Sequence, residues 1–203
     1  MDKKVLSVGD SWAVHMQEGM RAASPGTVVY GEGIPGCGIR LTVDNVGSAC
    51  NQWPVRWPQL MEEYRPDAVL LMIARWDVIP QRSTPNGPAR DLTDPVERLR
   101  FEQNLDSALD ILSARNTPVY VMNDVFVYNT SSLLMNKLIE IAARHHPNVH
   151  VLNLHDQLCH ANNCPSTLLG MPVYDATWHT THGAGMRLGA WILNQMFQPG
   201  YQG

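Results

Sequence analysis

Short apolar runs alternate along the chain with segments that have the spacing of amphipathic helices. The runs that predict strands cover residues 5–8, 27–30, 68–73, 119–122 and 149–152. The segments that predict helices cover residues 12–23, 53–64, 131–145 and 182–197, together with a helix that Pro95 opens, with apolar positions at Val96, Leu99, Leu105, Leu109 and Leu112. Strands separated by helices indicate a parallel sheet with right-handed crossovers. The pattern therefore predicts one α/β domain over residues 1–203, a three-layer α/β/α sandwich around a central parallel sheet.

Two long segments carry neither pattern. Residues 31–51 form a predicted loop rich in glycine, and a loop of this length in a compact domain is usually functional. Residues 79–94 are polar and rich in proline, which is typical of a surface insertion. The first loop has the spacing G-x-G-x-x-G from Gly31 to Gly36, so a nucleotide-binding enzyme is one alternative. Against it, Pro35 and Cys37-Gly38 continue the loop where that motif needs a helix.

Composition and charge narrow the classes of partner. The chain has 203 residues, 44% hydrophobic and 17% charged, as in an ordered globular domain. A net charge of −4 without a Lys/Arg cluster argues against nucleic acid and membrane surfaces as partners. Because no run of 18 apolar residues exists, we expect no membrane insertion by this segment. Residues 1–4 lead straight into the first strand without a signal peptide, so we expect either a native cytoplasmic start or the cut edge of a domain from a larger protein.

The four cysteines fall into two local pairs. Cys37 and Cys50 flank one loop, and Cys159 and Cys164 lie close together in another. Two such pairs favour two disulfides and an oxidising compartment. A zinc site and two reduced pairs are the alternatives. The C-x12-C and C-x4-C spacings lack the short knuckles of structural zinc sites, and we expect no metal.

The turn Gly9-Asp10-Ser11 is the first candidate for chemistry. Gly9 permits a sharp turn out of the first strand, and Asp10 or Ser11 can cap the helix that follows. The Ser11 hydroxyl would then lie at the carboxyl edge of the sheet, beside backbone N–H groups that are free to face an anion. An α/β protein usually places its chemistry there. An ordinary capped turn is the alternative interpretation.

A serine nucleophile needs a base within hydrogen-bond reach and a third group that orients the base. Candidates lie between Asp175 and Gly185, in the loop that enters the last helix. Loops that follow parallel strands gather at one edge, so this loop can meet the Ser11 turn. His179 or His182 could instead cap the last helix. Trp178 could stack on a sugar ring or shield the bond between His179 and Asp175.

An ordered set of motifs carries a resemblance to a known family. Gly9-Asp10-Ser11, Gly36-Cys37-Gly38 and the late Asp/His pair followed by Gly-Ala-Gly resemble the SGNH (GDSL-like) hydrolase superfamily. The chain is most similar to SGNH domains fused behind integral-membrane O-acyltransferases of bacterial cell-envelope glycans. Ala74-Arg75-Trp76-Asp77 and the segment from Cys159 to Cys164 carry this closer likeness.

The resemblance implies a flavodoxin-like topology and a set of roles. Ser11 would be the nucleophile and His179 the base, with the N–H groups of Ser11 and Gly36 in the oxyanion hole and Gly38 as the substitute for Gly36. In the family, an asparagine after the third strand donates a hydrogen bond in the oxyanion hole. In this chain Arg75 or Trp76 would be the donor instead. Trp178 and Asp10 are assigned to substrate binding.

The chain departs from the family pattern at the missing asparagine and again at the acid that orients the histidine. That acid stands three residues before the histidine, where this chain has Ala176, whereas Asp175 stands four before. Asp175 would then reach His179 through a bulge, or a backbone carbonyl would assist a dyad. A shift of the pair to Asp175 and His182 is a further alternative.

The resemblance also implies the reaction. We expect an O-acyl ester hydrolase or O-acyltransferase, with acetyl as the favoured acyl group, that acts on a cell-envelope carbohydrate or glycolipid through an acyl-serine and uses no cofactor. Its partners would be an acyl donor, a carbohydrate acceptor and a membrane acyltransferase domain of the parent chain, on the extracytoplasmic side. The alternative is a non-catalytic module of the same fold that binds a glycan or a partner domain.

Overall fold

The computed structural model describes residues 2–45, 48–123, 129–158, 166–168, 171–176 and 179–197. Its main sheet consists of β1 (Lys3–Gly9), β2 (Thr27–Gly33), β3 (Ala68–Met72), β4 (Val119–Met122) and β5 (Val149–Leu152). The helices are α1 (Ser11–Ala23), α2 (Trp53–Tyr64), α3 (Arg75–Val78), α4 (Pro95–Leu112), α5 (Thr130–His145), α6 (Leu154–Leu158) and α7 (His182–Phe197). Short 3-10 turns η1 (Val43–Asn45), η2 (Ala49–Gln52) and η3 (Ala114–Asn116) and a two-stranded ribbon of β6 (Thr167–Leu168) and β7 (Met171–Pro172) complete the described elements.

The five main strands are parallel and lie in the order β2-β1-β3-β4-β5. This is the flavodoxin-like order, in which the chain reverses direction across the sheet beside β1. At that switch point Val5 of β1 pairs with Val29 of β2 on one side and with Ala68 of β3 on the other. The predicted fold class, a parallel sheet in a three-layer sandwich, is confirmed.

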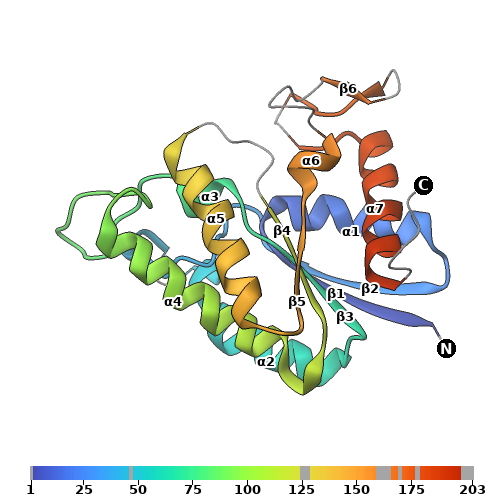
Figure 1. The fold of residues 1–203 in the computed structure, drawn as a ribbon, viewed down its shortest axis with the longest axis horizontal. Helices are drawn as coiled ribbons and strands as arrows, with labels where there is room; N and C mark the ends of the chain where they lie inside the picture. Colours follow the sequence, from blue (N-terminus) through green and yellow to red (C-terminus); the bar gives the residue numbers. More distant parts are fainter. Residues whose placement is uncertain are drawn as a thin grey trace.

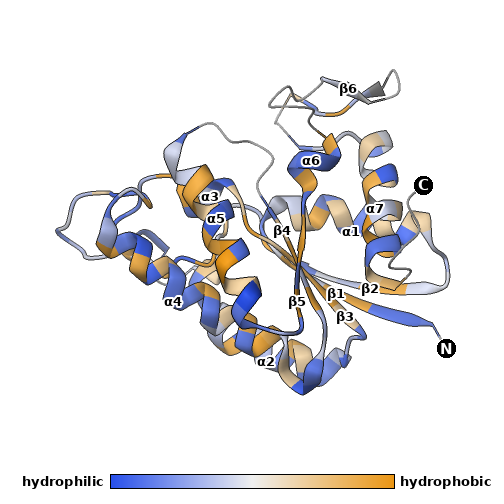
Figure 2. Cartoon of the chain, in the orientation of Figure 1, coloured by the Kyte–Doolittle hydropathy of each residue, from blue (hydrophilic) through white to orange (hydrophobic). Residues whose placement is uncertain are grey.

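Helices cover both faces of the sheet. One buried cluster joins the sheet to α2, α4 and α5, and the other joins it to α1, α6 and α7. Figure 1 shows α1 and α7 together at one side of the sheet and α2, α4 and α5 at the other. Hydrophobic positions concentrate in the strands that cross at the centre (Figure 2), as expected for parallel strands buried on both faces.

Only some of the apolar positions of α4 face the core. Val96 and Leu99 are 56% and 54% exposed, whereas Leu105, Leu109 and Leu112 are buried. The inward position on the first turn belongs to Glu97, whose carboxylate pairs with the buried Arg40 at 3.0 Å. A buried ion pair therefore replaces apolar packing at this end of the helix.

The segment 79–94, predicted to be a surface insertion, is partly packed against the rest of the domain. Gln81 and Arg90 form an isolated antiparallel bridge, and the Leu92 side chain is fully buried. The nucleotide-binding alternative finds no support, because Gly31 and Gly33 lie in β2 and the chain beyond them runs into η1 and η2 instead of a helix.

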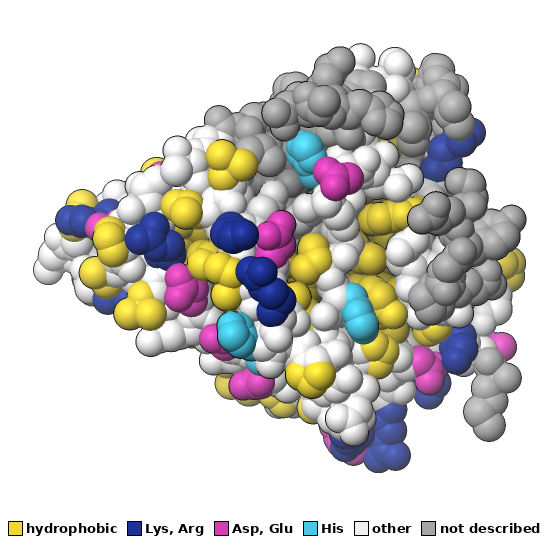
Figure 3. Space-filling model, in the orientation of Figure 1, with side chains coloured by type: hydrophobic (Ala, Val, Ile, Leu, Met, Phe, Trp, Pro, Cys, Tyr) yellow, Lys and Arg dark blue, Asp and Glu magenta, His cyan; other side chains and the backbone are white. Residues whose placement is uncertain are grey.

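Acidic and basic side chains of the described residues are interspersed on the face seen in Figure 3. Within the described ranges, no helix combines the length and the apolar character that crossing a bilayer requires.

Candidate active site

The turn after β1 presents Ser11 on the first turn of α1. Gly9 has φ +124°, and a Cβ there would lie 1.8 Å from the carbonyl oxygen of Met72. Only glycine fits so close to β3. The Asp10 N–H donates to the same Met72 oxygen at 3.2 Å. The β1–α1 turn is therefore fixed against the end of β3.

Asp10 is the cap of α1, one of the two caps that the sequence allowed. Its Oδ1 accepts a hydrogen bond from the Trp12 N–H at 2.9 Å, and the residue is 1% exposed. Such a cap stabilises a helix by about 1 kcal/mol. The structure thus gives this side chain, which we had assigned to substrate binding, a position that fixes the Ser11 turn.

His179 reaches Ser11 from a tight hairpin before α7. Tyr174 and Thr180 form an antiparallel bridge, and the N–H of Asp175 donates to the His179 carbonyl at 2.8 Å. The hairpin directs His179 Nε2 to within 2.7 Å of Ser11 Oγ, which is hydrogen-bond distance. His182, the alternative base, lies exposed on the first turn of α7.

Asp175 contacts His179 through the main chain. Its Oδ1 accepts a hydrogen bond from the backbone N–H of His179 at 3.1 Å, which closes the turn. Its negative charge raises the pKa of His179, but burial first and His15 second act in the opposite direction and prevail. The pKa of His179 therefore lies below its ordinary value, and the imidazole stays neutral to lower pH.

His15 is a residue of this site that the sequence analysis missed. It lies on α1 one turn after Ser11, and its ring stacks on that of His179 with centroids 4.6 Å apart and an angle of 10° between the planes. The spacing of four residues on a helix was a usable signal, because it places two side chains on one face.

The contact between α1 and α7 brings base and nucleophile together. A Cβ on Gly19 of α1 would lie 1.9 Å from the Gly185 carbonyl oxygen, and a Cβ on Gly189 of α7 would lie 2.1 Å from the Gly19 carbonyl carbon. The two backbones thus touch without intervening side chains. Figure 1 shows α7 crossing α1. This packing sets the position of α7 and of the His179 hairpin that precedes it.

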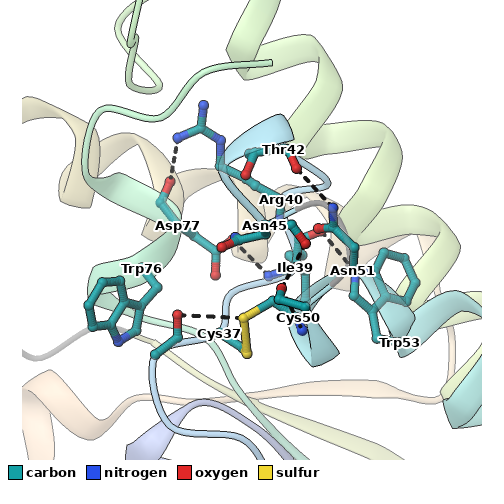
Figure 4. Close-up of a disulfide and its surroundings, with 12 residues drawn as sticks. Cys37, Ile39, Arg40, Thr42, Asn45, Cys50, Asn51, Trp53, Trp76 and Asp77 are labelled. Carbon is teal, nitrogen blue, oxygen red and sulfur yellow. Dashed lines mark hydrogen bonds between the residues drawn. A yellow bond between two sulfur atoms is a disulfide. The ribbon is translucent and has the colours of Figure 1, made fainter. Parts of the chain in front are cut away.

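The loop after β2 is fastened to the Ser11 turn and to itself. The Ile34 N–H donates to the Gly9 carbonyl at 2.8 Å, and Gly36, with φ +83°, lies two residues further on. Cys37 and Cys50 form the predicted disulfide (Figure 4). The other predicted pair, Cys159 and Cys164, lies outside the described residues.

Asp77 holds the same loop from the end of β3. Its Oδ1 accepts hydrogen bonds from the N–H groups of Ile39 at 2.8 Å and Arg40 at 2.9 Å. A Cβ on Gly38 would lie 2.4 Å from the carboxylate oxygens. Complete burial raises the pKa of Asp77 to about 6, although the two N–H donors and the Arg40 charge lower it. Figure 4 shows the carboxylate directed at this loop.

Arg75 and Trp76, the predicted substitutes for the family asparagine, begin α3 and are exposed. The Trp76 ring lies 3.9 Å from where a Cβ on Gly36 would be, so it flanks the proposed oxyanion loop, as Figure 4 shows. Among the described residues, no hydrogen bond or ion pair engages the Arg75 guanidinium. Trp178 lies outside the described residues.

A cavity of about 370 Å³ lies behind the loop after β2. Gly9 and Cys37 line it on the side of the loop, and Trp53 and Trp57 of α2 line it on the other. Both tryptophans are 5% exposed, so they belong to the core. Within the described ranges, no group of three His, Cys, Asp or Glu side chains has the geometry to hold a metal ion.

Known proteins share this fold. The carbohydrate acetylesterase Est24 from Sinorhizobium meliloti superposes with a TM-score of 0.61 at 14% identity, over 95% of this chain and 97% of that one. A catalytic mutant of Axe2, an acetylxylan esterase from Geobacillus stearothermophilus, gives 0.56 at 16% identity, over 96% and 94%. TesA gives 0.56 at 15% identity, over 97% and 99%. No curated protein matches the sequence.

One family model matches the sequence itself, over residues 1–137. The match contains the Ser11 turn, the loop with Gly36 and the Arg75-Trp76-Asp77 segment, whereas His179 lies beyond it. The model is described as an SGNH domain fused to AT3 domains. It covers more than half of the chain and agrees with the topology and with the neighbours of the same fold. This chain therefore belongs to the family of SGNH domains that are fused to AT3 domains.

Proposed function

We propose that this domain is a serine-dependent enzyme that cleaves an O-acyl ester, with acetyl as the acyl group, through an acyl-serine intermediate. The observation that carries the proposal is the 2.7 Å contact between Ser11 Oγ and His179 Nε2. A serine hydroxyl is a weak nucleophile until an adjacent base takes its proton. The lowered pKa of His179 supports the role of base, because the ring is then unprotonated at neutral pH.

The first half of the reaction forms the acyl-enzyme. His179 Nε2 takes the proton of Ser11 Oγ while Oγ attacks the ester carbonyl carbon, and the N–H groups of Ser11 and Gly36 stabilise the oxyanion. Arg75 or the Trp76 indole N–H supplies a third donor. The intermediate then expels the alcohol, which takes its proton from His179. Each oxyanion donor contributes about 10²–10³ in rate.

The second half releases the acyl group. His179 takes a proton from an acceptor hydroxyl, whose oxygen attacks the acyl carbonyl, and returns the proton to Ser11 Oγ. Water as acceptor gives hydrolysis, and a sugar hydroxyl gives transfer. Asp175 balances the charge that develops on His179, because its carboxylate raises the pKa of that ring.

Two structural neighbours and the family description support a substrate class for the proposed reaction. Est24 and Axe2 are described as acetyl esterases of carbohydrates, which supports an acetylated carbohydrate as substrate. The family description supports an AT3 membrane acyltransferase domain as partner, with this domain acting on a cell-envelope glycan at the extracytoplasmic side. The Cys37–Cys50 disulfide is consistent with such an oxidising location.

The test compares p-nitrophenyl acetate turnover by the wild type, Ser11→Ala and His179→Ala proteins. Both substitutions should lower kcat by about 10⁴-fold or more. Ser107→Ala and His145→Ala, at exposed positions on α4 and α5, are the matched controls and should retain wild-type turnover. Mass spectrometry should locate a fluorophosphonate adduct on Ser11. If wild type and Ser11→Ala turn over equally and no adduct forms, the proposal fails and the non-catalytic module is correct.

A second measurement separates the two acceptors. With the same ester as donor and an N-acetylglucosamine oligosaccharide as acceptor, a transferase yields acetylated sugar, whereas a hydrolase yields acetate whatever the sugar concentration.

A further inference from the structure

His15 faces the reacting pair from the same helix that carries the nucleophile. Ser11 and His15 are four residues apart on α1, so their side chains lie one above the other on one face. The imidazole of His179 therefore contacts α1 twice. Its edge meets Ser11 Oγ at 2.7 Å, and its face meets the His15 ring at 4.6 Å between centroids.

The hairpin and α1 contact different parts of His179. The main-chain bonds of the hairpin hold its backbone, whereas α1 meets its ring, and the terminal torsion of a histidine side chain is intrinsically broad. A parallel ring at 4.6 Å limits the tilt of the imidazole and leaves its Nε2 edge directed at Ser11. A base that tilts by a small amount loses alignment with the proton that it must take.

We propose that His15 is a positioning residue for the reaction and that its ring, stacked on His179, fixes the plane of the general base against Ser11. This inference rests on the function proposed above.

The stack also couples the charges of the two rings. When His15 is protonated, a second positive charge on His179 is disfavoured, and His15 accordingly contributes to the lowered pKa of His179, after burial. The described titratable and charged groups on the elements around the pair are Asp175 and Tyr174 on the hairpin, the buried cap Asp10, and the exposed Glu18, Arg21, His182 and Arg187. A neutral His15, by contrast, presents a polarisable face to the imidazolium that forms in the transition state.

Two substitutions separate the ring from its charge. His15→Phe keeps a stacking face and removes the ionisable group, so kcat at pH 8 should stay within about threefold of wild type. His15→Ala removes the face, so kcat should fall about tenfold with KM unchanged. Glu18→Ala, at an exposed position of the same helix, is the matched control for helix stability and should leave kcat unchanged.

The pH dependence gives a readout that a purely structural role would not move. In NMR titrations of the ring resonances, the His179 midpoint should move to higher pH in His15→Phe, and the acid limb of kcat/KM should move in the same direction. Equal midpoints in wild type and His15→Phe, or equal kcat in His15→Ala and Glu18→Ala, would overturn the inference. If Ser11→Ala turns over ester as fast as wild type, the proposed function fails instead, and the titration still decides whether the rings are coupled.

Discussion

The loop after β2 and the hairpin before α7 meet at the same edge of the sheet, and they are held by different kinds of contact. The first has a disulfide from Cys37, a buried carboxylate, Asp77, and a main-chain bond to Gly9. The hairpin with His179 has main-chain bonds across its own turn, the close packing of α7 on α1 and one ring stack.

The difference matches what each loop would have to do in the proposed reaction. A donor of the oxyanion hole acts best when it does not reorganise, so covalent and buried anchors suit it. A general base instead exchanges protons with two partners in turn, and its ring must keep its plane while its charge changes. We expect the first loop to respond to substitutions mainly in stability and the second mainly in activity.

The largest effect should come from removing the covalent tie. Cys37→Ser combined with Cys50→Ser opens a loop with a sequence separation of 13, and the free energy of unfolding should fall by about 3 kcal/mol. Urea unfolding with and without reductant measures this. Reductant should destabilise wild type and leave the double variant unchanged. An unchanged wild type would show that the hydrogen bonds of Asp77 suffice to hold the loop.

A smaller effect, visible only as a function of pH, should come from Asp77→Asn. The pKa of Asp77 is raised from 3.8 to about 6, so between these values the folded state keeps a proton that the unfolded chain has released. Wild type should therefore lose about 2 kcal/mol of stability relative to the variant as the pH rises from 4 to 7. Urea unfolding at several pH values tests this. Asp110→Asn, at an exposed position, is the control, and a constant difference for Asp77→Asn would contradict the prediction.

The smallest change in stability should come from Gly19→Ala, which acts on the hairpin. The new Cβ meets the Gly185 backbone, and overpacking of about 2 kcal/mol is partly offset by about 1 kcal/mol of helix propensity. The net loss is about 1 kcal/mol, but α7 must shift, so kcat should fall about tenfold. Thermal unfolding and ester turnover measure the two effects. Gly26→Ala, where a Cβ meets nothing within 4 Å, should change neither, and full activity of Gly19→Ala would show that the hairpin holds His179 without α7.

Local patterns predicted most of the fold. The helices at 53–64 and 182–197 and the strands at 119–122 and 149–152 have the predicted bounds, because each combines clear periodicity with a clear start or stop. The ion pair of Glu97 was not predictable in this way. At the helical period Val96 and Leu99 lie off the face that carries Leu105, Leu109 and Leu112, whereas Glu97 lies on it, and the partner that balances its charge there is the distant Arg40.

In the candidate site, too, the features with a local sequence signal were predictable and those that depend on distant contacts were not. The Gly9-Asp10-Ser11 turn is a local structure with a local signal, and the structure shows it as the sequence suggested. The choice of His179 over His182 as the contact of Ser11 depends on how α7 packs on α1, which the sequence does not encode locally. The role of Asp77 was missed because its partners, the N–H groups of Ile39 and Arg40, lie 38 and 37 residues away.

The contact between Ser11 and His179 spans 168 positions of the chain. During synthesis the nucleophile therefore leaves the ribosome well before its base, and the two meet only when α7 docks on α1. Under the proposed mechanism, the onset of ester turnover in a population of nascent chains would mark the time at which α7 docks on α1. Ester turnover would thereby report that the folding of the domain is complete.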